Sequence, residues 1–225
     1  MWDESVNASY ASDIFGIGRD DAAGLDQRVS MSVNTGAILT VATDNDFVSA
    51  NTDTTSRSTQ LSDLQFLTFS NNGGAHSGAL YTTDGTNNII VNATDEIFAG
   101  TLRTWLVQDT GGVGTVNLQF ENFPAVPAGG QYLLAVDPDG DFSDGNWVAT
   151  TVGTFNGGNI TFAHDFADNT NTYIKVIATP EFSMELGSAT SSQVEGNGTT
   201  HTVNIPVNIA FTLGNDVNVV FDTAD

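Results

Sequence analysis

Four aspartates within eight residues form the densest group of side chains that could do chemistry. Residues 137–145 read Asp-Pro-Asp-Gly-Asp-Phe-Ser-Asp-Gly and follow an apolar run. Calcium takes six to eight oxygen ligands, and alternating aspartates around a glycine are one way to gather such oxygens. Carboxylates this close repel each other unless a cation or water intervenes. We therefore expect a calcium site from Asp137, Asp139, Asp141 and Asp144, and a solvated acidic turn is the alternative.

A second acidic group lies near the N-terminus, where Asp20 and Asp21 follow Arg19 and Asp26 precedes Arg28. The chain has only five basic residues, so each is expected to form an ion pair or to cap carbonyl groups. A structural salt bridge that pins the N-terminal segment is the favoured interpretation. Asp20 and Asp21 remain candidate metal ligands.

Residues that commonly carry catalysis are missing or scattered. There is no cysteine, and His76, His164 and His201 occur singly, without the spacing of a zinc-binding pair. No Gly-x-Ser-x-Gly nucleophile motif is present. A glycosidase needs only two carboxylates, but nothing raises one pair above the others. We predict no catalytic residue and no enzyme activity, with a polysaccharide-active enzyme as a remaining alternative.

Aromatic side chains offer a different use, because their rings can stack on sugars at the loops of a β-sandwich. Trp105 and Trp147 lie inside apolar segments, so core packing is the favoured interpretation for both. A calcium-dependent carbohydrate-binding module that recognises surface glycans is the alternative function. The sequence does not identify a ligand-binding residue.

The net charge limits the possible partners. With 27 acidic and five basic side chains, the chain carries a formal charge of −22. Nucleic-acid binders need Lys and Arg at the phosphates, so we expect no nucleic-acid partner. No apolar stretch approaches the roughly 20 residues of a membrane span, so we expect no membrane insertion. An acidic excess is also typical of halophile proteins, in which it only solvates the surface.

The N-terminal residues carry no targeting signal that we can identify. Residues 1–4 lack both the basic region and the apolar run of a signal peptide. We expect either a cytosolic chain or a mature piece of something larger.

Alternating apolar and polar residues, punctuated by Gly, Asn and Asp, indicate strands throughout the first 180 residues. About ten strands at regular spacing predict an all-β fold, an antiparallel β-sandwich of jelly-roll or immunoglobulin-like kind. Residues 1–28 look polar apart from the apolar segment 14–18, and 94–103 is the best candidate for a short helical turn. The segment 43–60 is expected to be an exposed loop with solvated acids. The expected strands are 29–33, 37–42, 64–69, 89–91, 104–107, 116–120, 132–136, 147–155, 160–166 and 173–178.

Thr179-Pro180 marks an expected boundary between a sandwich module, residues 1–179, and a tail, residues 180–225. The tail has room for three or four strands, at 182–186, 202–211 and 217–221, which is too few for a sandwich of its own. We expect it to be completed by the first domain, by further chain or by another molecule.

Several strings resemble a known type of module. The segment 16–27, which begins Gly-Ile-Gly-Arg-Asp-Asp, is followed by Ser-Val-Asn at 32–34, and the segments 64–74, 103–116 and 132–143 fit the same pattern. They resemble a β-rich module of unknown function from large secreted bacterial surface proteins, often found after laminin-G or concanavalin-like domains. The resemblance covers roughly residues 2–178 and implies a secreted, cell-surface location.

The tail is similar to the first half of a Calx-β or related immunoglobulin-like repeat, through Val194-Glu195 and the segment 221–225. In such repeats the corresponding acids bind calcium where modules join, which implies Glu195 and Asp225 as metal ligands.

These observations together predict a non-catalytic, extracellular structural or adhesive module of a bacterial surface protein or filament. We expect it to be stabilised by calcium and to pair strands with adjacent domains or with copies of itself.

Overall fold

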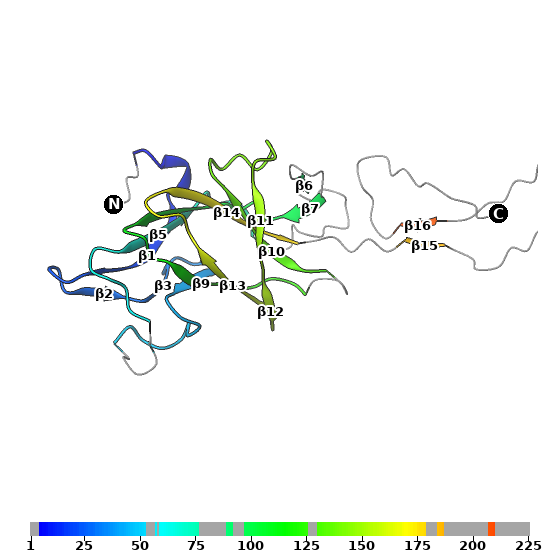
Figure 1. The fold of residues 1–225 in the computed structure, drawn as a ribbon. Helices are drawn as coiled ribbons and strands as arrows, with labels where there is room; N and C mark the ends of the chain where they lie inside the picture. Colours follow the sequence, from blue (N-terminus) through cyan, green and yellow to red (C-terminus); the bar gives the residue numbers. More distant parts are fainter. Residues whose placement is uncertain are drawn as a thin grey trace, which may run out of the picture. The chain divides into compact units, whose positions relative to one another are not determined.

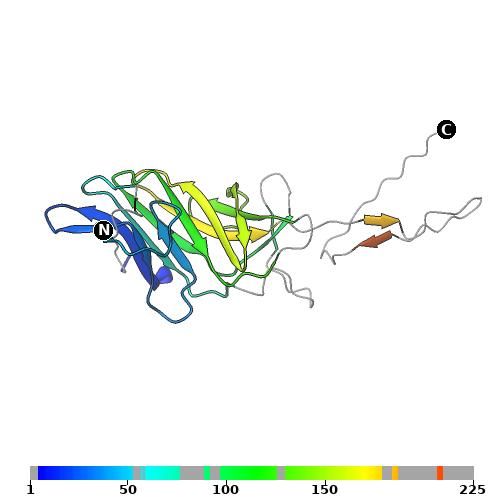
Figure 2. The ribbon, with the colours of Figure 1, turned by 90° about the horizontal axis from the view of Figure 1, so that it is seen from below.

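The computed structural model describes residues 5–52, 57, 59–76, 89–91, 97–125, 130–178, 184–186 and 207–209. The chain divides into two compact units, Met1–Pro180 and Glu181–Asp225. The first unit is a β-sandwich of two antiparallel sheets (Figures 1 and 2), which confirms the predicted fold class. In the described part, helical structure is confined to the single 3-10 turn η1 (Ala8–Tyr10). None of the described residues belongs to a helix with the length and apolar character of a membrane span.

The larger sheet contains nine strands. Seven follow one another side by side in the order β11 (Val148–Val152), β10 (Tyr132–Asp137), β14 (Asn171–Ala178), β8 (Trp105–Thr110), β5 (Phe66–Asn71), β1 (Ser12–Asp20) and β2 (Leu25–Gln27). The other two extend from the end of β14, where β7 (Ile97–Gly100) pairs with β14 and with β6 (Ile89–Val91).

The smaller sheet contains five strands, in the order β12 (Thr154–Asn156), β13 (Asn159–Asp165), β9 (Thr115–Phe120), β4 (Leu39–Ala42) and β3 (Val29–Met31). In the second unit, the described residues form one antiparallel pair, β15 (Met184–Leu186) with β16 (Val207–Ile209).

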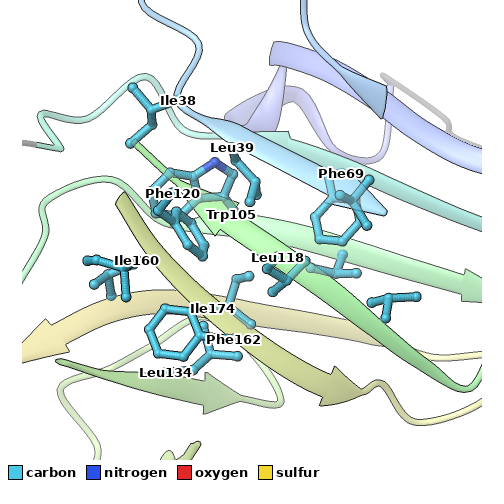
Figure 3. Close-up of a cluster of buried hydrophobic side chains, with 14 of the residues drawn as sticks. Ile38, Leu39, Phe69, Trp105, Leu118, Phe120, Leu134, Ile160, Phe162 and Ile174 are labelled. Atoms are coloured by element: carbon cyan, nitrogen blue, oxygen red, sulfur yellow. The ribbon is translucent and has the colours of Figure 1, made fainter. Parts of the chain in front are cut away.

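The core lies between the two sheets and is rich in aromatic rings. The inward residues of β9 are Val116, Leu118 and Phe120, and all three are fully buried because side chains alternate along a strand. Phe120 meets Trp105 of the opposite sheet edge to face, with ring centroids 5.0 Å apart. Figure 3 shows the two side chains together in the core. The prediction that Trp105 packs in the core is confirmed.

On each side of the sandwich the chain passes directly from one sheet to the other. On one side β2 continues through Arg28 into β3, and on the other β11 continues through Gly153 into β12. A Cβ on Gly153 would lie 2.6 Å from Ile160 and 2.7 Å from Phe162, both in β13. Only glycine fits this crossing without displacing those side chains.

Most strands of the first unit coincide with the predicted segments, but three predictions were wrong. The polar-looking N-terminal segment contains β1 and β2, since Phe15 and Ile17 face the core while Gly16 and Gly18 alternate with them. The candidate helical turn at 94–103 contains strand β7. The single strand expected at 147–155 is broken at Gly153, and the strand expected at 217–221 lies outside the described residues.

One buried carboxylate holds the loops at an end of the sandwich. Asp109 accepts hydrogen bonds from the backbone N–H groups of Gly112 (2.9 Å), Val113 (2.9 Å) and Asn169 (3.2 Å). These bonds join the β8–β9 turn to the β13–β14 loop. A carboxylate suits this position because it only accepts hydrogen bonds.

Replacing Asp109 with Asn should lower the free energy of unfolding by about 2 kcal/mol, because the amide NH₂ cannot accept one of these N–H groups. Urea denaturation measures the change. Asp165→Asn, an exposed change at the end of β13, is the matched control and should cost far less. Equal losses in the two variants would contradict the role given to Asp109.

Candidate functional site

The acidic segment predicted to bind calcium lies on the outer face of the larger sheet, the face turned away from the sandwich core. Ala135 and Asp137 of β10 point to this face, and they pair with Lys175 and Tyr173 of β14. Trp147 belongs to the small apolar cluster that covers this face, so its predicted packing role is confirmed. The cluster consists of Ala135, Phe142, Trp147 and Ile177, with Leu133 and Tyr173 packed against it.

Within the loop, each aspartate accepts a hydrogen bond through Oδ1 from the backbone N–H group two residues later in the sequence. Asp137 Oδ1 accepts from the N–H groups of Asp139 (2.8 Å) and Gly140 (2.5 Å). Asp139 Oδ1 accepts from the N–H group of Asp141 at 2.9 Å. Asp141 Oδ1 in turn accepts from the N–H group of Ser143 at 3.1 Å. These local bonds give the loop its shape, as expected of aspartate in turns.

Asp137 differs from the other three aspartates because it has no exposed surface. Its second oxygen, Oδ2, has no hydrogen-bond partner. Burial raises the pKa of this carboxyl, and the side chain and charge of Asp139 add to the rise. The N–H groups of Asp139 and Gly140 act in the opposite direction.

Two tyrosines and the chain's only lysine surround this buried carboxyl. Tyr10, which ends η1, lies 5.2 Å from Tyr173 between ring centroids. Burial, with Tyr173 and Asp137 contributing, raises the pKa of Tyr10 to about 12. Lys175 places its Nζ 4.7 Å from the ring centroid of Phe142. Burial lowers the pKa of Lys175, and the charge of Asp137 opposes that change.

The four predicted calcium ligands are therefore only partly brought together. Asp137 and Asp139 are in contact, and Asp144 accepts from the side chain of Asn146 at 2.7 Å. Asp139, Asp141 and Asp144 are all exposed. Over the described ranges, no three Asp, Glu or His side chains converge as a metal-binding group. The calcium site stays a prediction.

The second predicted cluster serves the β1–β2 hairpin. Arg19 pairs with Asp21 at 2.7 Å and Arg28 pairs with Asp26 at 2.6 Å, which confirms the expected salt bridges. Asp20 accepts from the N–H group of Ala23 at 3.0 Å. The last two predicted ligands, Glu195 and Asp225, lie outside the described residues.

A third polar site was missed because the segment 43–60 was expected to be exposed. Arg57 is 1% exposed and pairs with Asp44, Nη1 to Oδ1, at 2.7 Å. It also donates to the carbonyl groups of Asp46 and Ser49. The prediction of solvated acids was thus wrong for Asp44, which is largely buried, and Asp46 accepts from backbone N–H groups. The sequence did contain a signal for this buried ion pair, because Arg57 is one of only five basic residues and lies in an acidic segment.

The loop that Arg57 holds also covers an edge of the smaller sheet. The side-chain oxygen of Asn51 accepts from the N–H groups of Arg28 (2.7 Å) and Val29 (2.8 Å). Its NH₂ group donates to the carbonyl of Val29 at 3.1 Å. Asn51 thereby occupies backbone groups that an incoming strand would need.

Residues 1–172 match a protein family described as a domain of unknown function (DUF8202). The chain belongs to the DUF8202 family. The match falls within the first unit and includes both the loop of Asp137 and the loop of Arg57. No curated protein and no solved structure matches the chain. The description of DUF8202 assigns no activity, so the function has to be argued from the molecule itself.

Arg57→Met should destabilise the DUF8202 domain by about 3–5 kcal/mol, because Asp44 keeps a largely buried charge without its partner. Urea denaturation measures the loss, and hydrogen exchange should rise across residues 43–52. Arg19→Met is the control, since Arg19 pairs with an exposed acid and such pairs contribute about 1 kcal/mol or less. A smaller loss for Arg57→Met than for Arg19→Met would contradict the buried pair.

Asp46 should make stability depend on pH. Hydrogen bonds from Ser49 and the N–H group of Val48 lower the pKa of Asp46 from 3.8 to about 2. The ionised form therefore stabilises the fold above pH 4, and that contribution is lost as the pH falls toward 2. The urea midpoints of the parent and of Asp46→Asn should converge over that range, and a gap that stays constant would contradict the assignment.

Proposed function

We propose that this DUF8202 chain is a non-catalytic structural module of an extracellular bacterial surface protein or filament. Its sandwich joins neighbouring copies through strand pairing, and calcium stabilises the acidic loop between β10 and β11. The support comes from how the edges of the sandwich differ.

The observation that carries the proposal is the contrast between the two sides of the sandwich. Asn51 occupies the backbone of Val29 at the β3 edge. On the other side, none of the five residues of β11 is buried, and Val148 and Val152 are 55% and 58% exposed. An exposed edge strand with apolar side chains is a template for strand addition.

The distribution of charge also favours pairing between copies at the β11 edge. The whole segment 145–164 contains no charged residue, although the chain carries −22. Two copies of a polyanion repel each other over most of their surface, so contact is least opposed where acids are absent. A shift in register between Leu134 and Ala135 bends β11, and such bulges limit indiscriminate pairing. A partner strand must follow that bend, which favours a second copy over an arbitrary strand.

The carbohydrate-binding alternative has less support. Trp105 and Trp147 are both buried in apolar clusters, so neither ring is available to stack on a sugar.

Val148→Lys and Val152→Lys test the pairing edge. The parent chain should self-associate with rising concentration in light scattering after size-exclusion chromatography, and each lysine on β11 should shift it to monomer. Val33→Lys is the matched control, because Val33 is fully exposed but belongs to no strand, and it should leave association unchanged. A parent that is monomeric at every concentration, or equal losses in all three variants, would overturn pairing between copies through β11.

A further inference from the structure

We propose that Asp137 and Asp139 bind one calcium ion on the outer face of the larger sheet. This inference rests on the calcium-stabilised part of the proposed function. It narrows the four-aspartate expectation to two residues and makes Asp137 the anchoring ligand.

The starting observation is the unsatisfied oxygen of Asp137. The side chain has no exposed surface, and Oδ2 accepts no hydrogen bond. Water and protein donors normally satisfy a buried carboxylate oxygen, since an unsatisfied one is costly. Its Oδ1 already accepts two backbone N–H groups that shape the loop. The second oxygen therefore lacks a partner of opposite charge.

The nearest protein cation does not supply that partner. Lys175 sits on the neighbouring strand, but its Nζ lies over the ring of Phe142. The ion pairs found among the described residues all use arginine. Tyr10 could only donate a single neutral hydrogen bond, and it already packs against Tyr173.

Asp139 turns the unsatisfied oxygen into a two-carboxylate site. Its side chain contacts that of Asp137, and two carboxylates in contact repel each other unless a cation or a shared proton lies between them. One oxygen of Asp139 holds the N–H group of Asp141 at 2.9 Å, and the other has only a long contact, 3.5 Å, to Asn146. One oxygen of Asp139 is thus free to face a cation.

The other two aspartates are less suited. Asp144 uses both oxygens on Asn146, at 3.0 and 2.7 Å. Asp141 is exposed, as Asp139 is, but its Oδ1 accepts from both the N–H and the hydroxyl group of Ser143. This division provides two ligand positions and two matched controls within one loop.

Calcium is the cation that this chemistry favours. The donors are hard carboxylate oxygens, and an irregular loop tolerates the variable geometry of calcium better than the strict octahedron of magnesium. Water would complete the coordination. Phe142 and Trp147 pack on the sheet at two points of the loop and anchor the backbone that carries both carboxylates.

The aromatic surroundings allow a direct assay on the full chain. The hydroxyl of Tyr10 lies 3.1 Å from where a Cβ on Gly140 would stand, so a ring borders the loop. Terbium, a calcium substitute, should therefore luminesce when tyrosine and tryptophan are excited, and calcium should quench the signal by competition. Asp137→Asn and Asp139→Asn should abolish the signal, whereas Asp141→Asn and Asp144→Asn should retain it.

Thermal unfolding provides a second readout. At a calcium concentration about a hundredfold above Kd, the parent should melt roughly 5–10 °C higher than in chelator. Asp137→Asn should show no calcium shift. In chelator it should melt no lower than the parent, because the amide keeps the Oδ1 contacts without the unpaired charge. That result also shows that the variant folds.

Three results would overturn the site: no terbium signal in the parent, equal loss in all four variants, or a calcium shift that survives Asp137→Asn. The β11 variants keep this failure separate from failure of the proposed function. Loss of the calcium effect with intact association removes only the metal site. A monomeric parent that binds terbium keeps the site and removes the pairing.

Discussion

Scarcity of positive charge is the constraint on which this fold depends. Against 27 acidic residues the chain has five basic ones, so ion pairs cannot satisfy most of the carboxylates. The backbone takes their place. Asp109 holds three N–H groups, Asp137 holds two, and Asp46 holds those of Val48 and Ser49. A backbone N–H group brings no positive charge, but it needs no additional side chain. Its hydrogen bond to the carboxylate also fixes the loop to which the N–H group belongs.

The described arginines hold together segments that lie far apart in the sequence. Arg103 donates to the carbonyl groups of Gly74 and Gly36, and its Nη1 lies 3.8 Å from Asp13. Arg28 sits at the crossing from β2 to β3 and donates to the carbonyl of Arg57, which in turn holds its own loop. Each guanidinium thus joins segments far apart in the sequence, which its five donors in a rigid plane allow. The contacts of Arg28 and Arg57 therefore hold the loop that covers the β3 edge. No arginine lies near β11 in the sequence.

The alternation of apolar and polar residues made the sandwich predictable. Strand β1 and the buried Arg57 were missed for separate local reasons. Segments such as 116–120 and 132–136 alternate or run apolar, and the structure places strands there. β1 was missed because Gly16 and Gly18, weak strand formers, occupy its outer positions. Arg57 was missed because its burial depends on carbonyl groups that only the folded loop brings together. For the candidate site, the sequence singled out the acidic loop at 137–145, but it could not tell which aspartate the sheet would bury.

Topology explains why Asp137 in particular is buried. It is the last residue of β10, directly opposite Tyr173, and its side chain points to the outer face that the returning loop covers. The aspartates that follow lie beyond the end of the strand, where the chain has left the sheet. An asparagine at position 137 could accept the same two N–H groups through its side-chain oxygen. The loop's shape therefore does not require a charge there. A negative charge at this fully buried position is costly unless a partner of opposite sign comes to it.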